Sequence, residues 1–242
     1  SASAGLAACG YIPFVSTFAL FLALRAGDQV RAQIAQPRAN VKLVGGYAGL
    51  SDFADGASHQ SVEDLAILRA IPHITVISPC DIGQTRQAVR AIAEFDGPVF
   101  LRISRAEVDH LLPENTPFQI GRANVLRQGH DVTLIATGAI MAVAIRAADA
   151  LTRQGISVTL IDMPTIKPLD KDALLRAAKA TGAIVTVEEH NVCGGLGGAV
   201  CEELCQSSCQ SAGPLAIISL NRSSAQVNPV LMVVKSLILI AP

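Results

Sequence analysis

The sequence predicts an α/β protein made of two parallel-sheet, three-layer domains. Short apolar segments rich in β-branched residues alternate with longer segments whose apolar residues recur at helical spacing. Several of the short segments are apolar on both faces, which is typical of parallel strands covered by helices. Half of the 242 residues are hydrophobic and 16% are charged, so the chain can bury a large core.

The first half predicts four strands alternating with helices. The expected strands are 12–16, 41–44, 75–77 and 99–103. The expected helices are 17–36, 63–71 and 82–95. A glycine-rich turn (Gly45, Gly46, Gly49) is expected after the second strand. The first residues resemble the tail of a helix, and four strands are few for a doubly wound sheet, so we expect an N-terminally incomplete domain.

The alternation breaks over 106–128 and then starts again. Two prolines and mixed polar residues in this segment predict a linker. The expected domains are therefore 1–105 and 129–242. In the second domain we expect strands at 132–136, 157–162, 183–187 and 215–220, and helices at 138–154, 171–181 and 197–209. Residues 221–242 are apolar without a clear period.

The composition argues against several kinds of partner. The net charge of −1 and the absence of Trp give no basis for nucleic-acid binding. The apolar stretch 230–241 is too short to span a bilayer, so no membrane span is expected. No secretory signal is visible at the N-terminus, and a cytoplasmic location is expected.

Two sequence features could indicate a ligand site, a cysteine stripe and a glycine-rich segment, but their spacing argues against both interpretations. Cys201, Cys205 and Cys209 lie along one helical stripe and would not converge on a metal ion, so they are interpreted as small buried hydrophobic residues in a reducing compartment. The glycine-rich segment 194–198 leads into a helix N-terminus, where a phosphate can bind. It lacks the spacing of a dinucleotide-binding fingerprint.

The most informative segment is 55–60, Asp-Gly-Ala-Ser-His-Gln. It lies between an expected strand and an expected helix, at the end of the sheet where open α/β folds bind their ligands. A histidine there can take and give protons near neutral pH. The sequence therefore predicts a functional site on this loop.

Several motifs in the same order resemble the transketolase family. They are residues 10–21 (Gly-Tyr-Ile-Pro-Phe-Val-Ser-Thr-Phe-Ala-Leu-Phe), the loop 55–60, residues 63–72, Asp96-Gly97-Pro98 with residues 102–105, and Val187-Glu188-Glu189-His190 followed by residues 194–200. The resemblance covers roughly residues 3–220. It implies a pyrimidine-binding domain followed by a transketolase C-terminal domain, as in the short bacterial and archaeal forms that are often split into two subunits.

The resemblance implies thiamine diphosphate as cofactor, an electron sink that the protein orients. Phe18 and Phe21 match the aromatic positions that contact the aminopyrimidine ring, although both would otherwise be interpreted as core residues of a helix. The diphosphate and its Mg²⁺ or Ca²⁺ are expected on the N-terminal partner, because the chain has no Gly-Asp-Gly motif with an asparagine-bearing helix. No metal ligands are expected on this chain.

The resemblance also implies the substrate residues. His59 matches the histidine that moves protons on the sugar hydroxyls, and Asp55 the aspartate that recognises a substrate hydroxyl. Arg105 matches the arginine that holds the sugar phosphate. Tyr47 stands where the family usually has a second phosphate-binding histidine, so the need for a phosphorylated substrate stays open.

The implied activity is transfer of a two-carbon ketol unit between a ketose and an aldose. The family's catalytic glutamate precedes the segment that corresponds to Ser1, so this chain alone is expected to be inactive. The expected partners are an N-terminal transketolase subunit or domain, in a homodimer or an α₂β₂ assembly, and sugar phosphates. The alternatives are a 1-deoxyxylulose-5-phosphate synthase, a 2-oxoacid dehydrogenase beta-type subunit and a non-catalytic assembly module.

Overall fold

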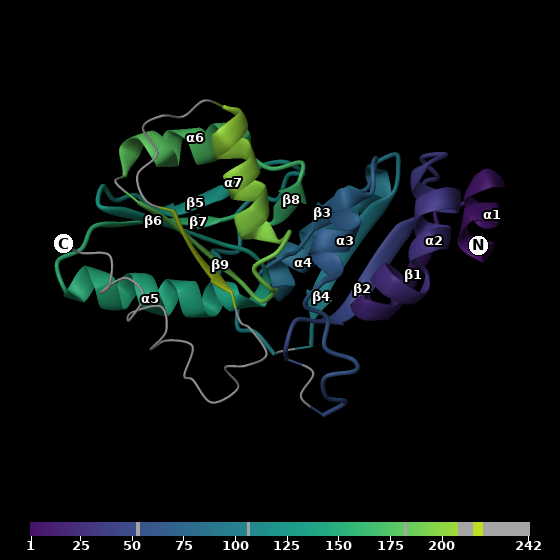
Figure 1. Cartoon of the computed structure of the whole chain (residues 1–242), viewed down its shortest axis with the longest axis horizontal. Helices are drawn as coiled ribbons and strands as arrows, with labels where there is room; N and C mark the ends of the chain where they lie inside the picture. The colour runs from purple at the N-terminus through teal and green to yellow at the C-terminus, as the bar shows by residue number, and fades with distance from the viewer. Residues whose placement is uncertain (52–53, 106, 182, 208–214, 220–242) are drawn as a thin grey trace.

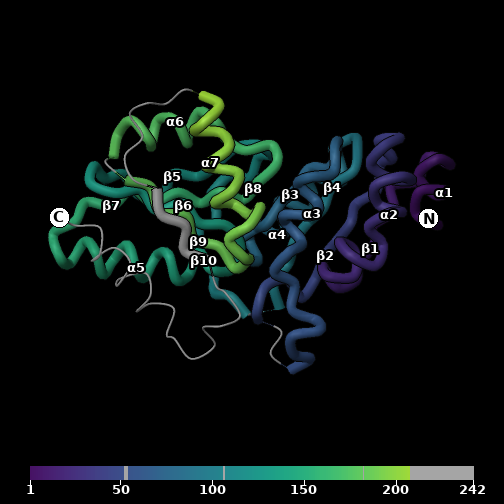
Figure 2. The backbone as a smooth tube through the Cα atoms, in the orientation of Figure 1, coloured from purple at the N-terminus to yellow at the C-terminus, as the bar shows by residue number. Residues whose placement is uncertain are grey.

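Two sheets with helices packed against them lie side by side in the computed structural model (Figure 1, Figure 2). The structure describes residues 1–51, 54–105, 107–181, 183–207 and 215–219, the last segment by its backbone. The predicted α/β class is confirmed. Each sheet is mostly parallel and also contains one antiparallel strand that the sequence did not predict.

The first sheet has five strands in the order β1-β2-β4-β3-β8. The strands are β1 (Phe14–Phe18), β2 (Lys42–Ala48), β3 (Thr75–Ile77), β4 (Val99–Ser104) and β8 (Thr165–Lys167). The first four run parallel, while β8 comes from the second half of the chain and pairs antiparallel with β3. The second half therefore contributes the fifth strand described in this sheet.

Alternate residues of β4 show how this sheet is covered on both faces. Val99 and Leu101 pack with Ala88 and Ile92 of α4, whereas Phe100 belongs to a larger core on the other face. That face is covered by α3 and by an irregular helical segment near the N-terminus. The helical elements of this half are α1 (Ala2–Ala8), η1 (Phe21–Arg25), α2 (Gly27–Gln29), η2 (Val30–Ala35), α3 (Asp64–Ala70) and α4 (Ile82–Glu94).

The second sheet has five strands in the order β10-β9-β6-β7-β5, of which β5 is antiparallel to β7. The strands are β5 (Asn124–Arg127), β6 (Val132–Ala136), β7 (Val158–Asp162), β9 (Ile184–Glu188) and β10 (Leu215–Ser219). Figure 1 shows α5 on one face and α6 and α7 on the other. The helical elements are η3 (Gly138–Ile140), α5 (Met141–Arg153), α6 (Lys171–Ala180) and α7 (Leu196–Gln206).

Two local predictions for the first half need correction. The expected helix 17–36 is helical only after Phe18, the last residue of β1, and much of it is π-helical (η1 and η2) rather than α-helical. Gly45 does not form a turn but lies inside β2, where a Cβ atom would come within 2.4 Å of the Phe100 ring. Glycine is needed there because an aromatic side chain packs directly against the backbone.

Most of the other predicted elements match closely, and 75–77 and 132–136 match the strands β3 and β6. The segment 106–128, expected to be a linker, contains the antiparallel strand β5. Residues 221–242 and Cys209 lie outside the described residues. Cys201 is half-buried and Cys205 is exposed, so the interpretation of these thiols as buried was wrong for Cys205. Across the described ranges, no helix has the length and apolar character that a bilayer crossing requires.

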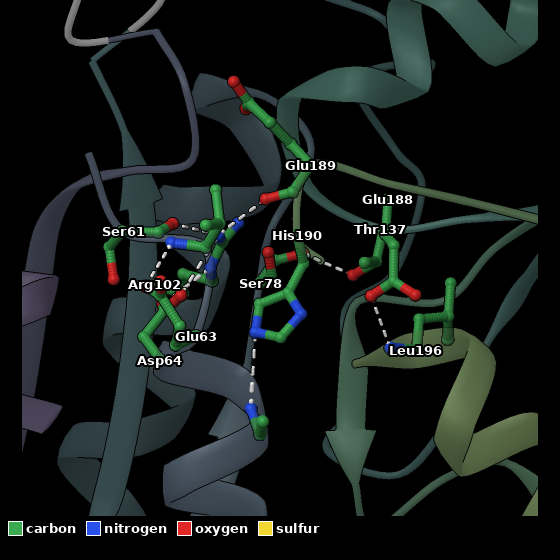
Figure 3. Close-up of polar contacts among 12 residues, drawn as sticks. Ser61, Glu63, Asp64, Ser78, Arg102, Thr137, Glu188, Glu189, His190 and Leu196 are labelled. Carbon is green, nitrogen blue, oxygen red and sulfur yellow. Dashed lines mark hydrogen bonds and ion pairs between the residues drawn. The ribbon is translucent and has the colours of Figure 1, made fainter. Parts of the chain in front are cut away.

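The two halves are joined around Arg102, which lies on β4 and is 4% exposed (Figure 3). Its Nε donates to Asp64 at 2.7 Å, and its Nη2 donates to the carbonyl oxygens of Ser61 at 3.2 Å and Glu189 at 2.9 Å. Asp64 is fully buried at the start of α3. A single guanidinium thus connects the first sheet, α3 and the C-terminal half.

Glu188, Glu189 and His190 are consecutive, and each contacts a different segment of the chain (Figure 3). Glu188 is the last residue of β9. Glu188 accepts from the backbone N–H groups of Leu196 and Gly197 at the start of α7. Glu189 contacts the first half through its side chain and its carbonyl. His190 accepts from an N–H of α3 at 3.4 Å. The amides at the glycine-rich turn before α7 are therefore satisfied by Glu188, which argues against the phosphate-loop interpretation of 194–198.

Asp162, at the end of β7, is a second buried acid at the contact between the halves. Its Oδ2 accepts from Gln84 of α4 at 2.6 Å and from Asn124 of β5 at 3.0 Å. Within the described residues its Oδ1 has no hydrogen-bond partner. Burial raises the pKa of Asp162 to about 6, although both hydrogen bonds act in the opposite direction.

We expect Asp64→Asn to lower the free energy of unfolding by about 3–5 kcal/mol, because it leaves the Arg102 charge buried without its counter-ion. Urea denaturation would measure the change. Glu202→Gln, which removes the exposed partner of Arg69, is the control and should cost less than about 1 kcal/mol. Equal effects of the two variants would contradict the importance of the buried pair.

We expect Asp162→Asn to change the pH dependence of stability. Because the folded protein holds this proton more tightly than the unfolded chain, wild-type stability falls as pH rises from the unfolded pKa near 4 through the folded pKa of about 6. Relative to wild type, the variant should therefore gain roughly 2 kcal/mol between pH 4 and pH 7. Thermal or urea unfolding measures the free energy of unfolding of both proteins at each pH. If this free energy changed with pH in the same way in both, Asp162 would not be a buried acid that titrates in this range.

Candidate active site

Four rings from separate segments meet at one edge of the first sheet. The centroid of the Phe18 ring lies 5.4 Å from that of Phe21, 4.3 Å from that of Tyr47 and 5.1 Å from that of His59. The Phe21 and His59 centroids are 5.5 Å apart. The imidazole meets both phenyl rings edge-on, a geometry in which each aromatic pair contributes roughly 0.5–1.5 kcal/mol beyond area burial.

The parallel strands explain why these residues meet. Phe18 is the last residue of β1, Tyr47 is the next to last of β2, and Arg105 follows the end of β4. These three strands are neighbours, so their carboxyl ends lie at the same edge, where open α/β sheets bind ligands. Phe18 pairs in register with Gly46, which brings its ring beside the next residue, Tyr47.

The backbone at Tyr47 is strained. Its φ angle is +59°, in the left-handed region that is uncommon for a bulky residue, and the pairing of β2 with β4 shifts register between Gly45 and Ala48. The irregularity turns the tyrosine ring toward Phe18 and leaves it 37% exposed. Backbone strain of this kind often marks a functional position.

Arg105 and Asp55 form the polar side of the cluster. The Arg105 guanidinium lies 5.2 Å from the Tyr47 ring centroid, and its Nη1 is 3.7 Å from an Asp55 carboxylate oxygen. Both side chains are close to half exposed. A planar cation that stacks on an aromatic ring and still faces solvent can bind an anionic group.

His59 lies against both phenyl rings, on the same loop as Asp55. Its side chain is half-buried, and its Nδ1 lies 3.0 Å from the hydroxyl oxygen of Ser58. The imidazole is therefore oriented by a neighbour on its own loop while the residue keeps contact with solvent. Such a group can hold or move a proton on a bound ligand.

The structure brings together all six residues that the sequence identified as candidates. They are Phe18, Phe21, Tyr47, Asp55, His59 and Arg105. Sequence reasoning missed three neighbours. Arg25 lies 4.3 Å from the Phe21 ring, Ser51 accepts from the Arg105 backbone N–H, and Glu189 reaches the start of the loop. Of these three, only Glu189 could have been found from the sequence, because it belongs to the Val187–His190 motif that follows a predicted strand.

The match to known domains covers both halves of the chain. Residues 1–109 match the transketolase pyrimidine-binding domain, and residues 121–229 match the transketolase C-terminal domain. A solved structure described as a split gene transketolase, in an inactive beta4 tetramer, is 39% identical. It aligns with a TM-score of 0.83 over 97% of this chain and 74% of that chain. This chain belongs to the transketolase family.

Curated relatives place it among split transketolases, as the C-terminal section or C-terminal subunit. A 6-deoxy-6-sulfo-D-fructose transketolase subunit of a Clostridium species is 44% identical over 83% of this chain and 62% of that protein. An apulose-4-phosphate transketolase subunit of Phocaeicola vulgatus is 41% identical over 85% of this chain and 66% of that protein. The chain therefore spans less than two thirds of the length of these relatives.

The residues present fit the aromatic end of the transketolase cofactor. The pyrimidine-binding domain is the part that implies thiamine diphosphate in this family. Phe18 and Phe21 are half-buried and form an aromatic surface at the ligand-binding edge, which suits a planar heterocycle. Among the described residues, no group of three His, Cys, Asp or Glu side chains is arranged to hold a metal ion.

Proposed function

We propose that this transketolase section takes part in thiamine diphosphate-dependent transfer of a two-carbon ketol unit between a ketose and an aldose. The observation that carries the proposal is the meeting of the Phe18, Phe21 and His59 rings beside the ion pair of Asp55 and Arg105. These groups provide an aromatic surface, a proton carrier, a hydroxyl acceptor and a cation within one site.

The rings would hold the cofactor. Phe18 and Phe21 would contact the aminopyrimidine, and the contact of Arg25 with Phe21 would keep the second ring in place. When bound, thiamine diphosphate supplies the carbanion and electron sink that break the carbon–carbon bond of a ketose. The diphosphate and its Mg²⁺ or Ca²⁺ would be held by an N-terminal partner.

The polar side would hold the sugar. His59 would hold and move a proton at a sugar hydroxyl, and Asp55 would accept a hydrogen bond from a neighbouring hydroxyl. Arg105 would bind an anionic group at the far end of the substrate. Tyr47 would place its hydroxyl beside this cation, where it can donate one hydrogen bond but adds no charge.

An exposed apolar surface supports a partner chain. β1 is an edge strand of the first sheet, and α1 buries none of its side chains. Five large apolar side chains of this end of the molecule are 44 to 65% exposed: Leu6, Tyr11, Ile12, Phe14 and Leu24. A surface of this kind is typical of protein contacts. We therefore propose that an N-terminal transketolase subunit or a second copy covers it, in a homodimer or an α₂β₂ assembly.

Reconstitution tests the proposed activity. The chain is mixed with an N-terminal transketolase subunit, thiamine diphosphate and Mg²⁺, and ketol transfer from a ketose phosphate to an aldose phosphate is measured. Pyruvate replaces the ketose in a second arm, because deoxyxylulose-phosphate synthases and 2-oxoacid dehydrogenases decarboxylate it. A complex that forms but acts only on pyruvate, or on neither donor, would overturn the proposal.

We expect His59→Ala to lower the kcat of the reconstituted complex on the order of 10²- to 10⁴-fold, because a proton carrier is lost. Thiamine diphosphate affinity should change much less, since the phenyl rings remain. His130→Ala, which changes a histidine that is 80% exposed on the other domain, is the matched control. An unchanged kcat in the His59 variant would contradict its catalytic role.

We expect Tyr47→His to lower the KM for phosphorylated sugars roughly threefold to tenfold, because the imidazole can add positive charge beside Arg105. Tyr47→Phe, which keeps the ring and loses the hydroxyl, is the control. The KM for unphosphorylated sugars should stay the same in both variants. An equal gain for both kinds of sugar would argue against a phosphate contact at this position.

A further inference from the structure

Glu189 reaches from the C-terminal domain to the start of the loop that carries Asp55 and His59. Its Oε1 accepts from the backbone N–H of Leu50 at 2.7 Å, and the backbone N–H of Ser51 lies near the same carboxylate. Figure 3 shows that the backbone carbonyl of Glu189 faces Arg102, whereas its side chain points away from that guanidinium. The residue therefore makes two separate contacts with the first half of the chain.

The residues held by Glu189 are linked to both ends of the site. The carbonyl of Leu50 accepts from Gln60 Nε2 at 3.3 Å, at the far end of the loop. Ser51 lies with its hydroxyl oxygen 2.7 Å from that of Ser104, and the same hydroxyl accepts from the Arg105 N–H at 3.1 Å. A shift of Leu50 and Ser51 would thus move the loop and the backbone of Arg105 together.

The glycine before this pair is shaped by the same carboxyl group. Gly49 has a φ angle of +79°, and a Cβ atom at this position would lie 2.3 Å from the carboxyl carbon of Glu189. Glycine is favoured by this φ angle, which strains residues with a Cβ atom, and a Cβ atom would also displace the Glu189 carboxylate. Both domains are therefore adapted to this contact, the first through Gly49 and the second through Glu189.

We infer that Glu189 is a positioning residue for sugar binding. It acts through Leu50 and Ser51, which contact Gln60 and the Arg105 backbone, so that Asp55, His59 and Arg105 face one substrate. This inference rests on the proposed function. An anionic acceptor suits the task, because hydrogen bonds to a carboxylate are shorter and stronger than those to a neutral oxygen.

The test uses the reconstituted complex with Glu189→Ala, Glu189→Gln and Gly49→Ala. Hydrogen exchange at residues 48–60, calorimetric binding of ribose 5-phosphate as the probe, and KM and kcat are measured. We expect Glu189→Ala to speed exchange at Leu50 and Ser51 and to weaken probe binding about tenfold, with a matching rise in KM. Glu189→Gln keeps an acceptor oxygen and should recover most of the loss. Gly49→Ala should have the same effects as Glu189→Ala, although Glu189 is still present.

Glu202→Ala is the control, because it removes an exposed ion pair between the domains, with Arg69, away from the loop. It should leave exchange at 48–60 and probe binding unchanged. The inference would be overturned if Glu189→Ala sped exchange equally across α3 and β4, or left probe binding unchanged. If the wild-type complex showed no ketol transfer, the proposed function would fail, while exchange and probe binding would still decide the role of Glu189.

Discussion

The buried charge of Arg102 is the constraint on which the arrangement of this molecule depends. A guanidinium that is 4% exposed must find partners within the protein, since an unpaired buried charge is very costly. Its partners come from the first turn of α3, the segment before it and the residue that follows β9. Satisfying this single residue therefore fixes where the second domain sits against the first sheet.

The site inherits its geometry from that arrangement. Arg105 follows Arg102 closely along the chain, and Glu189 provides both a carbonyl for Arg102 and a carboxylate for Leu50. The side chains proposed to face the sugar all belong to the first domain, yet their loop is held by the second. Under the proposed function, one subunit would keep the substrate groups in order while another supplied the diphosphate site of the cofactor.

Irregular backbone occurs at the site and in the helical segment that joins β1 to β2. Tyr47 has a left-handed conformation beside a register shift, and the segment after β1 contains the π-helices η1 and η2. Such features cost stability and persist where the surrounding structure and function require them. Regular helix patterns do not predict such irregularity, which is why 17–36 was expected as one continuous helix. The turn after the second strand was wrong for a different reason: the glycines were interpreted as turn residues, whereas Gly45 lies inside β2.

The sequence by itself determined the alternation of strands and helices and the strand 75–77, because these depend on local pattern. The candidate residues of the site came from the resemblance of short motifs to the transketolase family. Tertiary structure decided what depends on contacts between distant segments. Gly45 lies in a strand because the Phe100 ring needs its space, and Thr165–Lys167 is a strand because β3 offers it an edge. The contact of Glu189 with the loop joins residues 139 positions apart, a distance over which periodicity and spacing carry no information.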